Sequence, residues 1–180
     1  MDIPVKRVAL REDFKAEASA MKAAIDDDTI MIVGSAPCFP HGVVDDIAEL
    51  GEIALDTDVW LHVDACVGGY LAPFVKRLGR VFPDFAFAVP GVRSLSADLH
   101  KFGFAPKPSS TVLYRMEEDF QRQIFDVDPW TYGRMTTSTL VGTRPAGGIA
   151  GSWAVFKHLG IDGYTQVAAD LMEMVDGYVA

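Results

Sequence analysis

The sequence contains little cysteine and no long apolar segment. Its 180 residues include only two cysteines, Cys38 and Cys66, too few for a disulfide framework or a zinc site of four ligands. We therefore expect a reducing compartment and no metal ion. No apolar run approaches the roughly 18 residues that cross a membrane, and residues 1–13 lack the apolar core of a signal peptide. These absences predict a cytoplasmic protein without a membrane span.

Positive charge is also scarce. Lysine and arginine together number 16, against 25 aspartate and glutamate residues, which gives a formal net charge of −9. The basic residues are scattered, so neither nucleic acid nor an anionic lipid surface is an expected partner. A composition of 49% hydrophobic and 23% charged residues is ordinary for a globular protein, and 180 residues can bury the core of one α/β domain. We expect a small-molecule partner.

Short β-branched runs alternate with amphipathic segments along the chain. The apolar runs predict strands, the last of which can run antiparallel, at residues 29–33, 59–63, 85–89, 92–96 and 111–114, with a further strand-like run at 5–10. The amphipathic segments predict helices at residues 15–25, 43–55, 69–78, 117–125, 151–159 and 164–179, with loop at 126–148. Pro73 should delay the first regular turn of the third helix. This order is typical of a mostly parallel sheet with helices on both faces. Because the chain starts just before one element and ends inside another, we expect a segment of a larger chain.

The stretch from Trp60 to Ser110 holds an acid and an amine at the ends of two predicted strands. Asp64 follows the strand at 59–63, where open α/β sheets bind ligands, and a buried carboxylate there calls for a cation such as a protonated ring nitrogen. Lys101 follows the strand at 92–96, and partial burial would lower the pKa of its amine and make it nucleophilic. The two groups match the anchors of pyridoxal 5'-phosphate, its ring nitrogen and its aldehyde carbon. An aspartate after a strand can equally cap a helix, and a lysine can be a solvated surface residue, so the residues alone leave both interpretations open.

Four segments resemble the group II pyridoxal-phosphate-dependent decarboxylase superfamily, whose members are fold type I (aspartate aminotransferase-like) enzymes. They are VGSAPCFPHGVVDDI (residues 33–47), HVDACVGG (62–69), SLSADLHKFGFAPKPSS (94–110) and LVGTRPAGG (140–148). The HVDA and HK motifs occur in many members of the superfamily, so they indicate the superfamily but no branch of it. The FPHG segment, Cys66 and the APK after the lysine indicate its carbon–carbon lyase branch. The resemblance implies that residues 1–180 are one partial large domain, with the phosphate-binding loop upstream and the small C-terminal domain absent.

The resemblance also assigns roles to individual residues. Lys101 would form the Schiff base, and Asp64 would keep the ring nitrogen protonated. The remaining cofactor contacts would come from His100 near the phosphate and from Asp98, Ala65, Cys66 and Ser35. Lys107 would contact a substrate phosphate, and Arg144 would approach the active site of a neighbouring subunit in a homodimer. Phe102 and Phe104 stand where many lyases have tyrosine, and Pro108 replaces a glycine.

Three functions follow as hypotheses. The resemblance implies a pyridoxal-phosphate-dependent lyase that cleaves a phosphorylated long-chain base, such as sphingosine 1-phosphate, by retro-aldol chemistry into a fatty aldehyde and phosphoethanolamine. The alternative within the superfamily is an amino-acid decarboxylase, which would bind a carboxylate instead of a phosphate. A third hypothesis is a catalytically inert fragment with a structural or interaction role.

Overall fold

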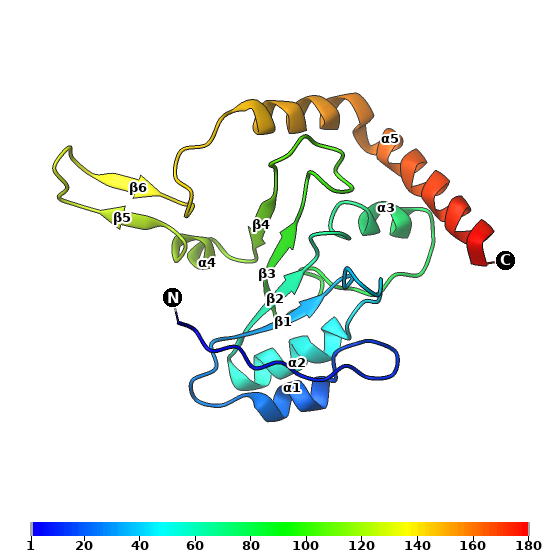
Figure 1. Ribbon diagram of the computed structural model, residues 1–180, viewed down its shortest axis with the longest axis horizontal. Coiled ribbons are helices and arrows are strands. Elements are labelled where there is room, and N and C mark those ends of the chain that lie inside the picture. The colour runs from blue at the N-terminus through cyan, green and yellow to red at the C-terminus, as the bar shows by residue number, and fades with distance from the viewer. Residues whose placement is uncertain (1, 180) are drawn as a thin grey trace.

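The structure is a computed structural model that describes residues 2–179. Its main body is a four-stranded sheet with helices packed against it, and a separate two-stranded hairpin projects from that body (Figure 1). In chain order the elements are α1 (Ala18–Ala24), β1 (Met31–Ser35), α2 (Ile47–Thr57), β2 (Trp60–Asp64), α3 (Ala72–Arg77), β3 (Val92–Ala97), β4 (Thr111–Tyr114), α4 (Glu117–Gln121), β5 (Phe125–Val127), β6 (Met135–Thr137) and α5 (Gly147–Val179).

The main sheet has the order β1-β2-β3-β4. Strands β1, β2 and β3 run parallel, and β4 pairs antiparallel with β3. The carboxyl ends of the three parallel strands therefore meet at one edge, as the alternation of strands and helices in the sequence predicts. Side chains alternate between the two faces of a strand. Leu61 and Val63 of β2 therefore lie on one face of the sheet, where both are fully buried. Trp60, His62 and Asp64 lie on the other face.

Helix α2 covers the face that contains Leu61 and Val63. The side chains of Ile47 and Leu50 lie so close to Gly34 of β1 that a Cβ there would be 2.7 and 2.8 Å from their terminal carbons. The opposite face of the sheet is more open, since Met31 and Val33 of β1 each retain 46% of their surface. Within residues 2–179, helical cover of the sheet is thus concentrated on one face, whereas the sequence pattern predicted helices on both.

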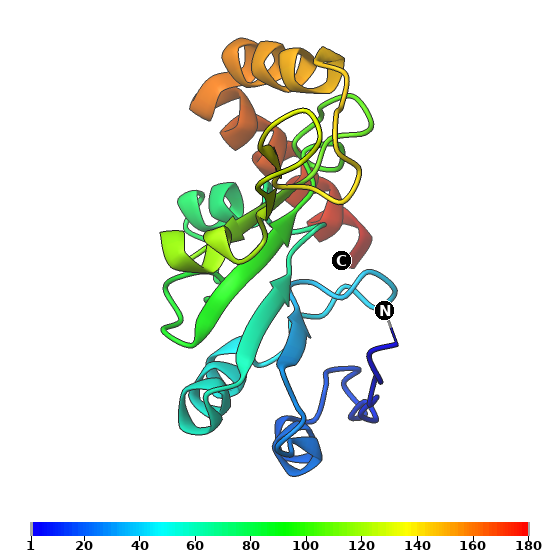
Figure 2. The same ribbon diagram turned by 90° about the vertical axis from the view of Figure 1, so that its left-hand side faces the viewer.

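Helices α3 and α5 pack together beside the carboxyl edge of the sheet (Figures 1 and 2). The sequence predicted two separate helices at 151–159 and 164–179. The structure confirms two helices: α5, from Gly147 to Val179, is broken by a kink at Gly160, whose φ of 58° and ψ of −171° lie outside the helical region. Glycine tolerates this conformation, so the chain bends there without a loop. No helix among residues 2–179 is long and apolar enough to cross a bilayer.

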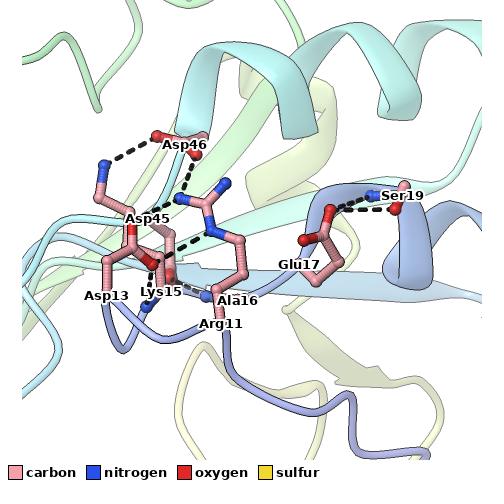
Figure 3. A network of polar contacts seen from close by, with 8 residues as sticks. All are labelled: Arg11, Asp13, Lys15, Ala16, Glu17, Ser19, Asp45 and Asp46. Atoms are coloured by element: carbon pink, nitrogen blue, oxygen red, sulfur yellow. Dashed lines mark hydrogen bonds and ion pairs between the residues drawn. The ribbon is translucent and has the colours of Figure 1, made fainter.

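Two adjacent carboxylates fasten the N-terminal segment to the start of α2 (Figure 3). Asp46 forms ion pairs with Arg11 and Lys15, each at 2.9 Å. Asp45 is buried and accepts the backbone N–H of Ala16 at 2.8 Å through one oxygen, while its other oxygen accepts the N–H of Ser35 at 2.7 Å. One side chain therefore joins the N-terminal segment to the carboxyl end of β1.

Three predictions about secondary structure were wrong. Residues 85–89 form turns instead of a strand, although Phe85 and Val89 are buried in the core as a strand would bury them. The run at 5–10 forms no strand and contributes only an isolated bridge between Leu10 and Ala16. The loop at 126–148 contains the antiparallel hairpin β5–β6. The antiparallel direction of β4 and the late start of α3 at Pro73 are confirmed.

Candidate functional site

The register of the sheet brings three polar residues side by side. Ser35 of β1 pairs with Asp64 of β2, and Asp64 pairs with Ser96 of β3. Because residues in register share a face, the three side chains form a row at the carboxyl edge. This is where open α/β sheets bind ligands. The sequence predicted Ser35 and Asp64 here.

The Asp64 carboxylate is held by donors from two segments. Its Oδ1 accepts the backbone N–H of Cys66 at 3.1 Å and the hydroxyl of Ser96 at 3.1 Å. Partial burial would raise the pKa of the carboxyl group, but hydrogen bonds from the thiol and backbone of Cys66 and from Ser96 outweigh burial and lower the pKa. Asp64 is therefore ionised at neutral pH and can stabilise a cation.

Lys101 lies in the turn that follows β3. Its Nζ is 2.8 Å from Asp98 Oδ2 and donates to Cys66 Sγ at 2.8 Å. The hydrogen bond that the ammonium donates to Asp98, followed by the one that it donates to Cys66, raises the pKa of the amine. The predicted lowering of this pKa by burial is therefore wrong, because the side chain is a third exposed and has an anionic partner.

The turn that presents Lys101 is tight. Its backbone is closed by hydrogen bonds from Lys101 N–H to Asp98 O and from Phe104 N–H to Lys101 O, at 3.2 and 3.0 Å. Phe104 has a left-handed φ of 56°, which a non-glycine residue adopts only when its surroundings hold it there. His100 bonds Ser109 through both backbone and imidazole. The side chains of Asp98, His100 and Lys101 thus project from one well-defined turn.

Cys66 connects the two charged groups of the site. Its sulfur accepts a hydrogen bond from the Lys101 ammonium, and its thiol also forms a hydrogen bond with Asp64. Burial raises the pKa of the thiol, and the Asp64 carboxylate adds to that increase, while Lys101 opposes it. The neighbouring Ala65 is fully buried. The structure therefore brings together the predicted cofactor contacts Ser35, Asp64, Ala65, Cys66, Asp98, His100 and Lys101.

The two predicted substrate residues lie outside this cluster of contacts. Lys107 and Arg144 are exposed, and among residues 2–179 neither takes part in a side-chain hydrogen bond or ion pair. The segment that holds Arg144 leads into α5, whose first residues pack on the loop of Lys107, because a Cβ on Gly148 would lie 2.9 Å from Pro108 O. The roles of both residues stay predictions.

Sequence reasoning missed several polar residues around the site. Ser96 donates to Asp64, and Ser110 donates to Asp98. Asp45 holds the backbone of Ser35. Ser96 is the last residue of the predicted strand at 92–96, which could have indicated it, but its pairing with Asp64 depends on strand register. Nothing in the sequence signals the long-range contact of Asp45.

A second polar group lies on the same sheet face as Asp64. Ser94 Oγ accepts the indole N–H of Trp60 at 2.7 Å and lies 2.8 Å from His62 Nδ1. Burial lowers the pKa of His62, opposed only by the nearby Asp64 carboxylate. His62 is therefore neutral at pH 7. In the chain from residue 2 to residue 179, no three His, Cys, Asp or Glu side chains are arranged to hold a metal ion.

Removing the Asp98 carboxylate tests the electrostatics of the turn without any cofactor. We expect Asp98→Asn to lower the pKa of Lys101, since a neutral amide no longer favours the ammonium. At pH 8 the amine of this variant should be acetylated roughly five- to tenfold faster than in the wild type, because more of it is unprotonated. Mass spectrometry of the peptide that contains Lys101 measures the rate.

Asp84→Asn is the matched control for this measurement. Asp84 pairs with Lys76 at the surface, so its replacement should leave the rate at Lys101 unchanged. Equal rates in Asp98→Asn and the wild type would show that Asp98 does not hold the ammonium.

The chain is similar to known proteins over most of its length. A model of the pyridoxal-dependent decarboxylase conserved domain matches residues 1–179. Sphingosine-1-phosphate lyase from Oryza sativa subsp. japonica is 46% identical over 173 residues, covering 96% of this chain and 32% of that protein. L-aspartate decarboxylase from Thermococcus kodakarensis is 41% identical over 166 residues, covering 92% of this chain and 43% of that protein.

A solved structure matches the fold as well. Sphingosine-1-phosphate lyase from Burkholderia pseudomallei superposes with a TM-score of 0.86 at 40% identity, covering 89% of this chain and 37% of that chain. The chain thus spans about a third of the length of the lyases it matches. Its fold is that of the large domain of fold type I pyridoxal phosphate enzymes, as the resemblance implied. The chain belongs to the pyridoxal-dependent decarboxylase family, whose cofactor is pyridoxal phosphate.

Proposed function

We propose that this chain is the cofactor-binding part of a lyase that cleaves a phosphorylated long-chain base, such as sphingosine 1-phosphate, into a fatty aldehyde and phosphoethanolamine. The observation that carries the proposal is the junction of Lys101, Cys66 and Asp64 at the carboxyl edge of the sheet. Lyases named for sphingosine 1-phosphate are among the most similar relatives in both sequence and structure.

The residues at the site fit pyridoxal phosphate. Lys101 supplies the amine that would hold the aldehyde carbon, and ionised Asp64 supplies the anion that would face the protonated ring nitrogen. When bound, the cofactor withdraws electrons from the carbon attached to the substrate amine. His100 belongs to the same turn as Lys101, and its Nε2 lies 3.7 Å from Asp98 Oδ2.

The chain's own residues then have separable tasks. Asp98 holds the ammonium of Lys101 before the cofactor is attached, and the amine must lose that proton to act as a nucleophile. Asp64 would stabilise the positive charge of the protonated ring nitrogen, and Ser96 holds the Asp64 carboxylate in place by donating a hydrogen bond to it. Lys107 is exposed on the loop after the turn and would pair with the substrate phosphate as a point charge.

We further propose that the complete protein is a homodimer in which Arg144 approaches the partner's site. Exposed apolar residues on and beside the segment around Arg144 support this assembly, because Leu140, Val141 and Tyr132 retain at least three quarters of their surface. The tip of the hairpin β5–β6 projects away from the main sheet, and the segment after β6 leads back to α5 (Figure 1). Apolar surface of this kind marks interaction sites.

An amino-acid decarboxylase is the second candidate, and the L-aspartate decarboxylase relative favours it. The two functions need different anchors on the substrate, a cation for a phosphate in one and an arginine for a carboxylate in the other. A third candidate is an inert fragment with a structural role. An inert fragment would show neither the visible absorbance of lysine-bound pyridoxal nor borohydride trapping at Lys101.

The deciding experiment incubates the protein, loaded with pyridoxal phosphate, with sphingosine 1-phosphate and separately with aspartate. We expect release of fatty aldehyde in the first reaction and no carbon dioxide in the second. Lys107→Ala should raise KM for the phosphorylated substrate at least roughly tenfold, since it removes a charged contact with the phosphate. Lys157→Ala, on α5, is the control and should change nothing. Carbon dioxide without aldehyde would replace the lyase with the decarboxylase.

A further inference from the structure

Tyr164 of α5 contacts the turn that carries Lys101. Its hydroxyl donates to the backbone carbonyl of Gly103 at 2.6 Å, two residues beyond the lysine. The side chain is almost completely buried, with 7% of the residue exposed. A buried hydroxyl bonded to a buried carbonyl is costly to break, because both groups would lose a partner that water cannot replace there.

The ring of Tyr164 also joins two other elements. It stacks on Phe74 of α3 with centroids 5.1 Å apart and an interplanar angle of 18°. It lies 6.4 Å from the ring of Phe104 in the turn and 5.9 Å from Phe156 in the first half of α5. Helix α3, both halves of α5 and the turn therefore meet at one side chain.

The path of the backbone explains how Tyr164 reaches this position. The kink at Gly160 redirects α5 four residues earlier. Without the kink, a straight helix would carry Tyr164 along the original axis instead of across α3. The turn leaves no room for a side chain at Gly103, since a Cβ there would lie 2.5 Å from Leu99 O.

We propose that Tyr164 is a positioning residue that fixes the turn of Lys101 and couples its geometry to α5. The inference rests on the proposed role of Lys101 as the attachment point of the cofactor. Among the side-chain hydrogen bonds of residues 2–179, the one from Tyr164 is the link between α5 and this turn. Movement of α5, which lies far along the chain from Lys101, would thus change where the amine is held.

The test uses Tyr164→Phe, which removes only the hydroxyl and keeps the ring. We expect the amides of Phe104 and Ala105 to exchange with deuterium roughly tenfold faster than in the wild type, because the turn opens more often. The pH profile of Lys101 acetylation should also shift to lower pH, since a looser turn holds the ammonium less closely against Asp98. Tyr178→Phe, at an exposed position on the same helix, is the control and should change neither measurement.

Two results would overturn the inference. Unchanged exchange in Tyr164→Phe would mean that the hydroxyl does not hold the turn. Faster exchange with an unchanged Lys101 profile would reduce Tyr164 to a purely structural residue. If the variant does not fold, the wild type decides, because coupled elements must show the same dependence of exchange on denaturant at residues 103–105 and 161–168. Separate dependences would refute the coupling.

The experiment is independent of the proposed function. Neither exchange nor acetylation needs bound cofactor. If the wild type fails to bind pyridoxal phosphate, the proposed function fails, while a changed exchange rate and Lys101 profile in Tyr164→Phe would still support the coupling. If cofactor binds but Tyr164→Phe behaves like the wild type, only the coupling fails.

Discussion

Lys101→Ala should abolish covalent attachment of pyridoxal phosphate and lower the rate of the proposed lyase reaction by at least about a thousandfold, a loss typical of removing a covalent catalyst. The reason is local, since Lys101 is the amine that the turn presents to Cys66, the residue whose backbone N–H binds Asp64. Absorbance spectra and mass spectrometry after borohydride reduction measure the attachment directly. The fold should survive, because the side chain is a third exposed and supports no part of the core.

Lys107→Ala separates this effect from a general loss of positive charge. Lys107 is exposed and lies six residues further along the same segment. Its replacement should leave borohydride trapping at Lys101 intact while weakening substrate binding. Trapped cofactor in Lys101→Ala, or full activity of that variant, would exclude every version of the mechanism proposed above.

Asp64→Asn should lower the reaction rate at least about a hundredfold, because an amide cannot supply the negative charge that stabilises a protonated ring nitrogen. The substitution keeps an acceptor for Cys66 N–H and Ser96 Oγ, so the local backbone should be preserved. Cofactor affinity and turnover should therefore fall much more than the free energy of unfolding, which chemical denaturation measures.

Asp56→Asn is the control for this substitution. Asp56 lies at the exposed end of α2, where it forms an ion pair with Lys22 at 3.5 Å, and an exposed ion pair of this kind contributes little to stability. Full activity in Asp64→Asn would mean that the carboxylate does not face the ring nitrogen. Loss of activity accompanied by unfolding would assign Asp64 a structural role instead.

Sequence reasoning located the acid and the amine but could not describe how they are joined. Asp64 and Lys101 carry motif signals and follow apolar runs that predict strands. Their connection through Cys66 and Ser96 depends on the register of β2 against β3, which shifts between Leu61 and His62. Such an irregularity leaves no trace in hydrophobic periodicity. For the same reason the pKa of Lys101 was predicted in the wrong direction, because burial could be inferred but the partner Asp98 could not.

The errors in the fold have a common physical origin. Residues 85–89 are apolar because Phe85 and Val89 pack into the core, yet burial alone does not distinguish a strand from a buried turn. The strands β5 and β6 have three residues each, too few to show alternation. By contrast, the longer and strongly patterned segments β2 and α2 were predicted to within a few residues.

Trp60 and His62 share one hydrogen-bond partner, the hydroxyl of Ser94. An indole N–H can only donate, so Ser94 Oγ accepts from Trp60 and keeps one lone pair and its own hydrogen for His62 Nδ1. The hydroxyl can therefore serve either neutral tautomer of the imidazole, by donating to a bare Nδ1 or by accepting from Nδ1–H. A tryptophan two residues earlier in the same strand thus competes with a histidine for a serine of the next strand. Trp60→Phe would leave both lone pairs and the hydrogen of this hydroxyl to His62.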